Sequence, residues 1–218
     1  MKKFYHKENR KTWGIFILAL VIALVSLPFL PEQLPIHFDS QGQVDNYAGK
    51  WSIFIAPAVI LLLLFMAEIL RKIDPKAKNY QQFESYYYDI HFAVSLLMLF
   101  IEVYILLFVS GLEWGINQLI YPAAALLFIF LGNILPKLKH NYFIGIRTSW
   151  TIASEKVWYL THRFAGKVFV IGGIAILISN FFFISYITLI FFIIVTIMVL
   201  LSVFSSLYYF KKYEKTSN

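Results

Sequence analysis

One stretch of the sequence combines cations, large aromatic side chains and glycines, a mixture typical of recognition elements. It covers residues 141–166, and its cationic and aromatic members include Arg147, Lys156, His162, Arg163, Trp150, Trp158 and Tyr159. A lipid-buried run would not hold so many charges, and a disordered linker would not hold so many large aromatic side chains. We therefore expect an ordered recognition element at a membrane surface.

A second polar segment, residues 31–51, follows the first apolar run of the chain. Residues 36–38 alternate as in a strand, and Asp39 and Gly42 suit the first and fourth positions of a type I turn. His37, Asp39 and Asp45 could ligate a metal, but their spacing fits no regular metal motif, so a hydrogen-bonded loop is favoured. We expect this loop to contact an extracellular ligand through His37, Asp39, Gly42, Asp45, Tyr47 and Lys50.

One carboxylate, Glu102, falls inside an apolar run, roughly eight residues from its outer end and hence ~12 Å deep. A buried carboxylate costs several kcal/mol unless it is protonated or partnered, so it should face the helix bundle. His91, Ser95 and Glu102 share one helical stripe. The functional interpretation is a proton relay or a substrate contact. The alternative, which we favour, is a protonated or hydrogen-bonded side chain that fixes helix packing.

The sequence offers little that indicates catalysis. It has no Cys, which excludes disulfides, thiolate metal sites and cysteine nucleophiles. It carries no serine-hydrolase, zinc-protease or phosphate-loop motif, and its five His residues are dispersed over several segments. We expect neither an enzyme nor a bound metal or cofactor.

The elements around these polar residues are apolar and long. The chain is 60% hydrophobic and only 14% charged, which favours a membrane protein. Six apolar runs approach the ~20 residues that cross a bilayer, and they cover residues 13–30, 52–70, 90–110, 117–135, 165–184 and 187–210. The first run could be a signal peptide, but it is long and lacks a clear cleavage site. We predict an all-α membrane protein with six transmembrane helices.

The positions of the basic residues predict the orientation of these helices. Of the 19 Lys and Arg, only Lys50 would lie outside, in the loop 31–51. The positive-inside rule then places both termini and the loop 136–164 in the cytoplasm. The net charge of +7 therefore reports topology, and we expect no direct nucleic-acid binding.

Within the cytoplasmic loop, residues 141–149 should form a turn and residues 151–164 an amphipathic helix. Gly145 permits a bend, Thr151 suits the N-cap, and Glu155 suits the first turn. Trp158 and its aromatic neighbours would rest in the lipid headgroup region, while Arg147 and Arg163 would meet anionic lipids or an acidic protein surface.

The same residues resemble a known family. The pattern is Asn141-x-x-x-Gly145-Ile-Arg147-Thr148-x-Trp150-Thr151, then Ser154-Glu155-x-x-Trp158 and Thr161-His162-Arg163-x-x-Gly166. It resembles the core of the SdpI family of bacterial membrane immunity proteins. The outer loop, with Pro31, Pro35, His37, Gly42, Asp45, Tyr47 and Lys50, resembles an uncharacterised N-terminal domain often fused to that family.

This resemblance implies a multi-pass protein of the bacterial cell membrane that protects the cell from a secreted toxic peptide. It also implies signalling, in which a cytoplasmic transcriptional repressor is recruited to the membrane. We expect a two-helix module at 1–89 and a four-helix module at 90–218. The inner contacts would come from Asn141, Gly145, Arg147, Thr148, Trp150, Glu155, Trp158, His162 and Arg163. The alternative is a small proton-linked transporter that uses Glu102.

Overall fold

The computed structural model describes residues 7–111 and 114–214. Six of its helices are long and apolar enough to cross a membrane, so the prediction of six transmembrane helices is confirmed. They are α1 (Arg10–Ser26), α2 (Ile55–Ile73), α3 (Glu84–Val109), α4 (Ile116–Ile134), α6 (Glu155–Phe182) and α7 (Ile187–Tyr213). Residues 112–113, between α3 and α4, lie outside the described residues.

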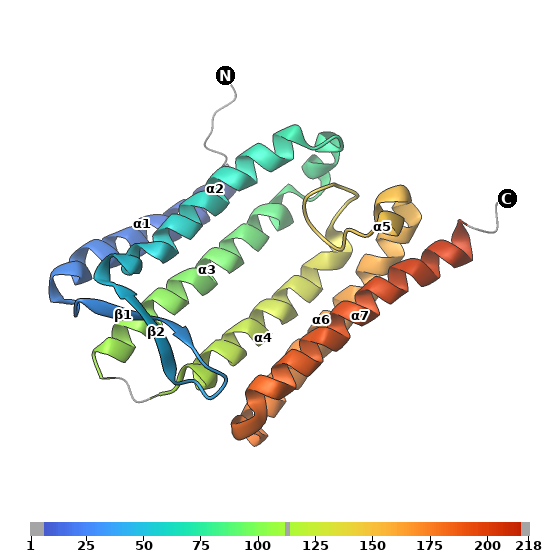
Figure 1. The fold of residues 1–218 in the computed structure, drawn as a ribbon. Coiled ribbons are helices and arrows are strands. Elements are labelled where there is room, and N and C mark those ends of the chain that lie inside the picture. Colours follow the sequence, from blue (N-terminus) through green and yellow to red (C-terminus); the bar gives the residue numbers. More distant parts are fainter. Residues whose placement is uncertain (1–6, 112–113, 215–218) are drawn as a thin grey trace.

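The helices form two groups that meet at α3 and α4. Helices α1, α2 and α3 pack against one another, as do α4, α6 and α7, and α3 contacts α4. Figure 1 shows the start of α1, the end of α7, the α2–α3 connection and the short helix α5 (Ser149–Ala153) at one end of the bundle. We call this the basic end. The predicted division of the chain near residue 89 stays a prediction, as does the cytoplasmic location of this end.

A β-hairpin occupies the opposite end of the bundle (Figure 1). It pairs β1 (Gln33–Phe38) with β2 (Val44–Gly49) in an antiparallel ladder. The predicted turn is confirmed, because the Gly42 amide donates to the Asp39 carbonyl at 3.0 Å and Gly42 has a φ of 82°. The sequence predicted strand character at residues 36–38, but it did not predict the second strand.

Helices α4 and α6 cross closely because glycines meet at the crossing. A Cβ atom on Gly132 would lie 2.7 Å from the Gly166 carbonyl oxygen, and one on Gly166 would lie 2.6 Å from that of Gly132. Such contacts are too short for any side chain. Small residues allow the backbones of membrane helices to approach and gain packing contacts.

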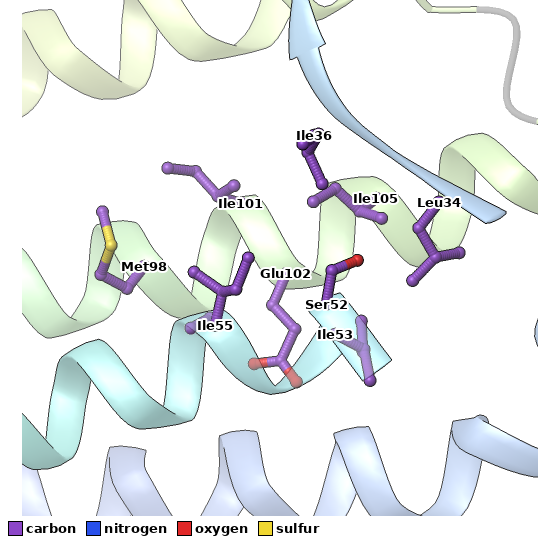
Figure 2. Close-up of a pocket in the computed structure, with 10 residues that line it drawn as sticks. Leu34, Ile36, Ser52, Ile53, Ile55, Met98, Ile101, Glu102 and Ile105 are labelled. Atoms are coloured by element: carbon purple, nitrogen blue, oxygen red, sulfur yellow. The ribbon is translucent and has the colours of Figure 1, made fainter. Parts of the chain in front are cut away.

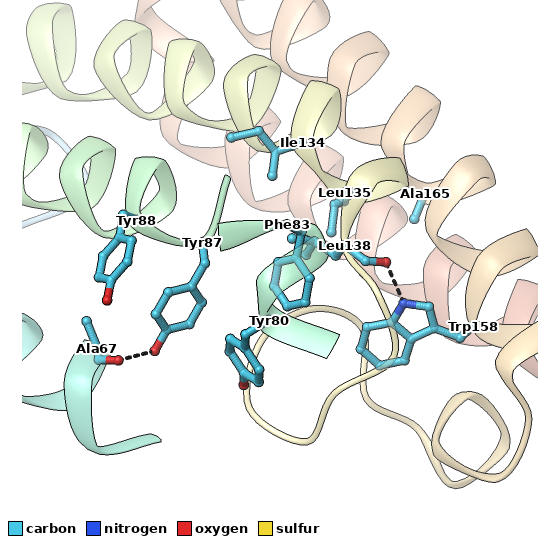
Figure 3. Packing of buried hydrophobic residues seen from close by; sticks show 10 residues of the cluster. All are labelled: Ala67, Tyr80, Phe83, Tyr87, Tyr88, Ile134, Leu135, Leu138, Trp158 and Ala165. Atoms are coloured by element: carbon cyan, nitrogen blue, oxygen red, sulfur yellow. Dashed lines mark hydrogen bonds between the residues drawn. The ribbon is translucent and has the colours of Figure 1, made fainter. Parts of the chain in front are cut away.

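An aromatic cluster fills the basic end and joins the two helix groups (Figure 3). Its buried members are Ala67, Tyr80, Phe83, Tyr87, Tyr88, Ile134, Leu135, Leu138, Trp158 and Ala165. The Tyr87 hydroxyl donates to the Ala67 carbonyl at 2.8 Å, and the Trp158 indole N–H donates to the Leu138 carbonyl at 2.9 Å. These bonds satisfy polar atoms that would otherwise be buried without partners.

Candidate functional site

The loop between α4 and α5 is built around the side chain of Asn141. Its Oδ1 accepts the amide hydrogens of Phe143 and Ile144, at 2.9 and 2.7 Å. Its Nδ2 donates to the carbonyls of Lys139 and Ile144, at 2.9 and 3.0 Å. Asn141 is fully buried, so these bonds hold the loop in one conformation. A partner could not reach this side chain.

The connection between α2 and α3 is tied to the same loop. The Tyr80 hydroxyl donates to Asp74 Oδ2 at 2.8 Å, and that oxygen also accepts the Tyr142 amide hydrogen at 2.9 Å. The Asn79 side chain donates from Nδ2 to the His140 carbonyl at 2.7 Å. Burial, and secondarily the bond to Asp74, raises the pKa of Tyr80, so its hydroxyl remains a neutral donor.

Gly145 and His162 form the second fixed point of the loop. Gly145 has a φ of 112°, and a Cβ atom there would overlap His162 Nε2. The Ile146 amide donates to that Nε2 at 3.0 Å, while Nδ1 lies 2.8 Å from the Trp158 carbonyl. Because Nε2 accepts, Nδ1 carries the proton and the imidazole is neutral.

The two helices after the loop are capped differently from the prediction. Thr148 caps α5, accepting the Thr151 amide hydrogen at 3.2 Å, and Ser154 caps α6, accepting the Val157 amide hydrogen at 3.3 Å. The predicted N-cap at Thr151 is wrong, because that hydroxyl closes the cap of α5 and donates to the Ile146 carbonyl at 2.8 Å. The predicted helix 151–164 is likewise broken at Ser154. Glu155 does lie in the first turn of α6.

The first turns of α6 bury a face that the sequence assigned to lipid. Trp158 and His162 are 2% and 1% exposed and stack with ring centroids 4.1 Å apart. The expected headgroup position of Trp158 is therefore wrong, because its indole fills the aromatic cluster. Tyr159 and Arg163 are exposed on the opposite face. Hydrophobic periodicity alone could not show which aromatic ring turned inward.

Several of the predicted inner contact residues keep side chains that are exposed or half-buried. Arg147 is exposed and donates to the Tyr142 carbonyl at 2.7 Å, and Trp150 is half-buried. The Glu155 carboxylate lies 3.4 Å from the Lys76 ammonium on the α2–α3 connection. We use the term inner face for the exposed or half-buried side chains Arg147, Trp150, Glu155, Tyr159 and Arg163.

Some of the predicted contact residues of the hairpin maintain its structure, whereas others are exposed. Asp39 Oδ1 accepts the amide hydrogens of Gln41 and Gln43, at 2.8 and 2.9 Å, so Asp39 maintains the turn with Gly42. Lys50 pairs with Glu32 at 2.8 Å.

Three of the predicted contact residues remain accessible. The His37 ring pairs with the Asp45 carboxylate across the strands at 2.5 Å, and both side chains are exposed. Tyr47 is 53% exposed. We use the term outer face for His37, Asp45 and Tyr47.

The hairpin tip is bonded to both α4 and α7. The Ser40 carbonyl accepts a hydrogen bond from Asn117 of α4 at 3.4 Å and one from Thr188 of α7 at 2.7 Å. Beside the tip, at the end of β1, Phe38 packs against the rings of Tyr104 and Phe108 of α3. The hairpin tip therefore connects the segment between α1 and α2 to α4 and α7, which run to the basic end (Figure 1).

Glu102 lies beneath the hairpin and is only 1% exposed, so the predicted inward orientation is confirmed. Figure 2 shows its side chain extending from α3 toward Ile53 and Ile55. It lines a mainly apolar cavity of about 140 Å³. Within the described residues, neither carboxylate oxygen has a hydrogen-bond partner. The Ser95 hydroxyl also lacks one there, whereas His91 Nδ1 bonds the Tyr87 carbonyl at 2.8 Å.

Sequence reasoning missed Asp74 and Tyr80. The Asp74-Pro75 pair is a turn signal at the end of α2. It does not reveal that the carboxylate would hold a loop 68 residues further along the chain. Tyr80 carried no signal beyond its aromatic type.

Comparison with known proteins gives two family matches in the order that the sequence predicted. Residues 137–207 match the SdpI/YfhL protein family, and residues 14–61 match a domain of unknown function, DUF1648. The chain is 29% identical over 206 residues to Immunity protein SdpI of Bacillus subtilis strain 168, covering 94% of this chain and 97% of that protein. It is 31% identical over 71 residues to Uncharacterized membrane protein YbgB of the same strain, covering 33% and 75%. No solved structure gives a significant match.

Proposed function

The chain belongs to the SdpI/YfhL family, and from this membership and the geometry we propose that it protects its cell from a secreted toxic peptide. The relationship extends over nearly the whole of an immunity protein, including both the hairpin and the loop between α4 and α5. This full-length similarity is the observation that carries the proposal. The protein acts without catalysis, by binding at the cell membrane.

The outer face supplies the peptide contact. It lies at the end of the bundle opposite the basic end, where a secreted molecule would arrive if the basic end is cytoplasmic (Figure 1). His37 and Asp45 offer hydrogen-bonding groups, and Tyr47 offers an exposed aromatic surface. Aromatic side chains are frequent anchors of protein interfaces.

The inner face supplies the signalling contact with a cytoplasmic transcriptional repressor. Arg147, Trp150 and Tyr159 combine charge with aromatic area on a loop that is rigidly held by Asn141 and His162. A rigid loop loses little conformational entropy when a partner binds, which favours recognition.

Complementation of a gene-deletion strain tests the outer contact. The strain is challenged with cell-free culture supernatant of its parent while it expresses wild-type protein, Tyr47→Ala or Trp114→Ala. Trp114 is a matched control because it is another large exposed aromatic residue, 59% exposed and adjoining the start of α4. Wild type and Trp114→Ala should restore survival and Tyr47→Ala should not. Equal survival of the two variants at equal expression contradicts the assignment.

A reporter gene driven by the promoter of this gene tests the inner contact. Arg147→Gln should abolish the response of the reporter to peptide while survival is retained, since Arg147 precedes α5, which lies at the end of the bundle opposite the hairpin (Figure 1). An unchanged response would mean that residues other than Arg147 make the signalling contact. Loss of both survival and expression would indicate a folding defect.

A proton-linked transporter is the second candidate, and it is favoured by the carboxylate of Glu102, which has no hydrogen-bond partner among the described residues. A carboxylate without a partner inside the membrane lowers the stability of the protein, and residues retained at such a cost often have a function. Glu102→Gln preserves the shape of the side chain and removes its proton exchange. Lost protection with normal folding would support transport, and full protection would exclude the relay.

A further inference from the structure

A groove runs along the basic end of the bundle between α4 and α6. It has a volume of about 520 Å³ and opens beside the Gly132–Gly166 crossing, where neither helix has a side chain to fill it. Arg163 and Lys167 line it toward the loop end of α6, and Val170 lines it further along the helix. The groove is therefore cationic at the level of the loops and apolar further along the helices.

The two cations are available to a ligand. They are four residues apart on α6, so they lie on one face of the helix, and both are exposed. The Arg163 guanidinium donates one hydrogen bond to the Tyr159 hydroxyl at 2.7 Å and lies 5.4 Å from the centre of that ring. These contacts orient the guanidinium and leave other N–H groups unused. Among the described residues that line the groove, none is Asp or Glu.

We propose that this groove binds one anionic phospholipid. The phosphate would lie between Arg163 and Lys167, and an acyl chain would follow Val170 and Ile171, which is 67% exposed. Basic pockets between transmembrane helices at the cytoplasmic side commonly bind lipid headgroups. A free phosphate would leave the apolar part uncovered. A cytoplasmic protein at the level of Arg163 would not reach Ile171, which lies eight residues, or ~12 Å, further along the span Glu155–Phe182.

The proposal is independent of immunity and is tested on purified protein in detergent. Native mass spectrometry measures the dissociation constants of phosphatidylglycerol and phosphatidylcholine for wild type and for Arg163→Gln/Lys167→Gln. The control is Lys211→Gln/Lys212→Gln, which removes the same charge from the last turn of α7, outside the groove. Thermal unfolding confirms that each variant is folded.

Wild type should prefer phosphatidylglycerol. Because each cation near a lipid surface contributes ~1 kcal/mol, the groove variant should bind it about thirtyfold more weakly, with binding of phosphatidylcholine unchanged. The control should lose much less. Equal losses in the two variants, or no preference in wild type, would overturn the site. If inorganic phosphate alone displaced phosphatidylglycerol, Arg163 and Lys167 would bind free anions instead of lipid.

Discussion

Replacement of Asn141 by Ala should destabilise the loop between α4 and α5 without unfolding the helix bundle. The side chain makes four hydrogen bonds to backbone groups between Lys139 and Ile144. After truncation the amide hydrogens of Phe143 and Ile144 lose their acceptor. A buried donor without a partner costs ~1–3 kcal/mol, and these two residues are only half-buried, so water can replace part of the loss. We expect a loss of about 2 kcal/mol in local stability.

Hydrogen–deuterium exchange of the peptide that contains residues 143 and 144 measures this loss. An energy of about 2 kcal/mol corresponds to a roughly thirtyfold increase in exchange. Asn133→Ala is the matched control, since Asn133 is exposed and its side chain makes a single bond to the Ile129 carbonyl, at 2.8 Å. Exchange in Asn141→Ala that is no faster than in Asn133→Ala would refute the role of Asn141 as the centre of the loop.

Three further predictions concern the membrane-spanning region and the hairpin. Gly166→Ala should lower the melting temperature, because the new Cβ meets the Gly132 carbonyl, whereas Gly14→Ala has open space and should not. Glu102→Leu should raise the melting temperature, since it removes a buried polar group without a partner among the described residues, worth ~1–3 kcal/mol; a decrease would reveal a partner. Thr188→Val should remove the 2.7 Å bond to the hairpin tip and accelerate exchange there about two- to tenfold. Unchanged exchange would mean that other contacts hold the tip.

The sequence predicted the features that depend on local composition. Apolar runs located all six spans, and the pairing of Asp39 with Gly42 located the hairpin turn. The inward position of Glu102 followed from the cost of placing a carboxylate in lipid. These properties require no knowledge of which helices are neighbours.

The properties that the sequence missed depend on contacts between distant segments. The acceptor for the Tyr142 amide is Asp74, and His162 accepts from Ile146 across a turn made by Gly145. Trp158 is buried while the adjacent Tyr159 is exposed, and packing within the aromatic cluster, including the bond to the Leu138 carbonyl, decides which ring turns inward. The family motif thus contains residues that build the loop as well as residues that a partner can reach.

Survival of a deletion strain in its parent's cell-free culture supernatant tests the immunity proposal most directly. Parent and deletion strain are compared at equal cell density, with the deletion strain also carrying the gene on a plasmid. The proposed role predicts that the deletion strain loses viability and that the plasmid restores it. Equal survival of parent and deletion strain, in a supernatant that kills an unrelated sensitive strain, would contradict it.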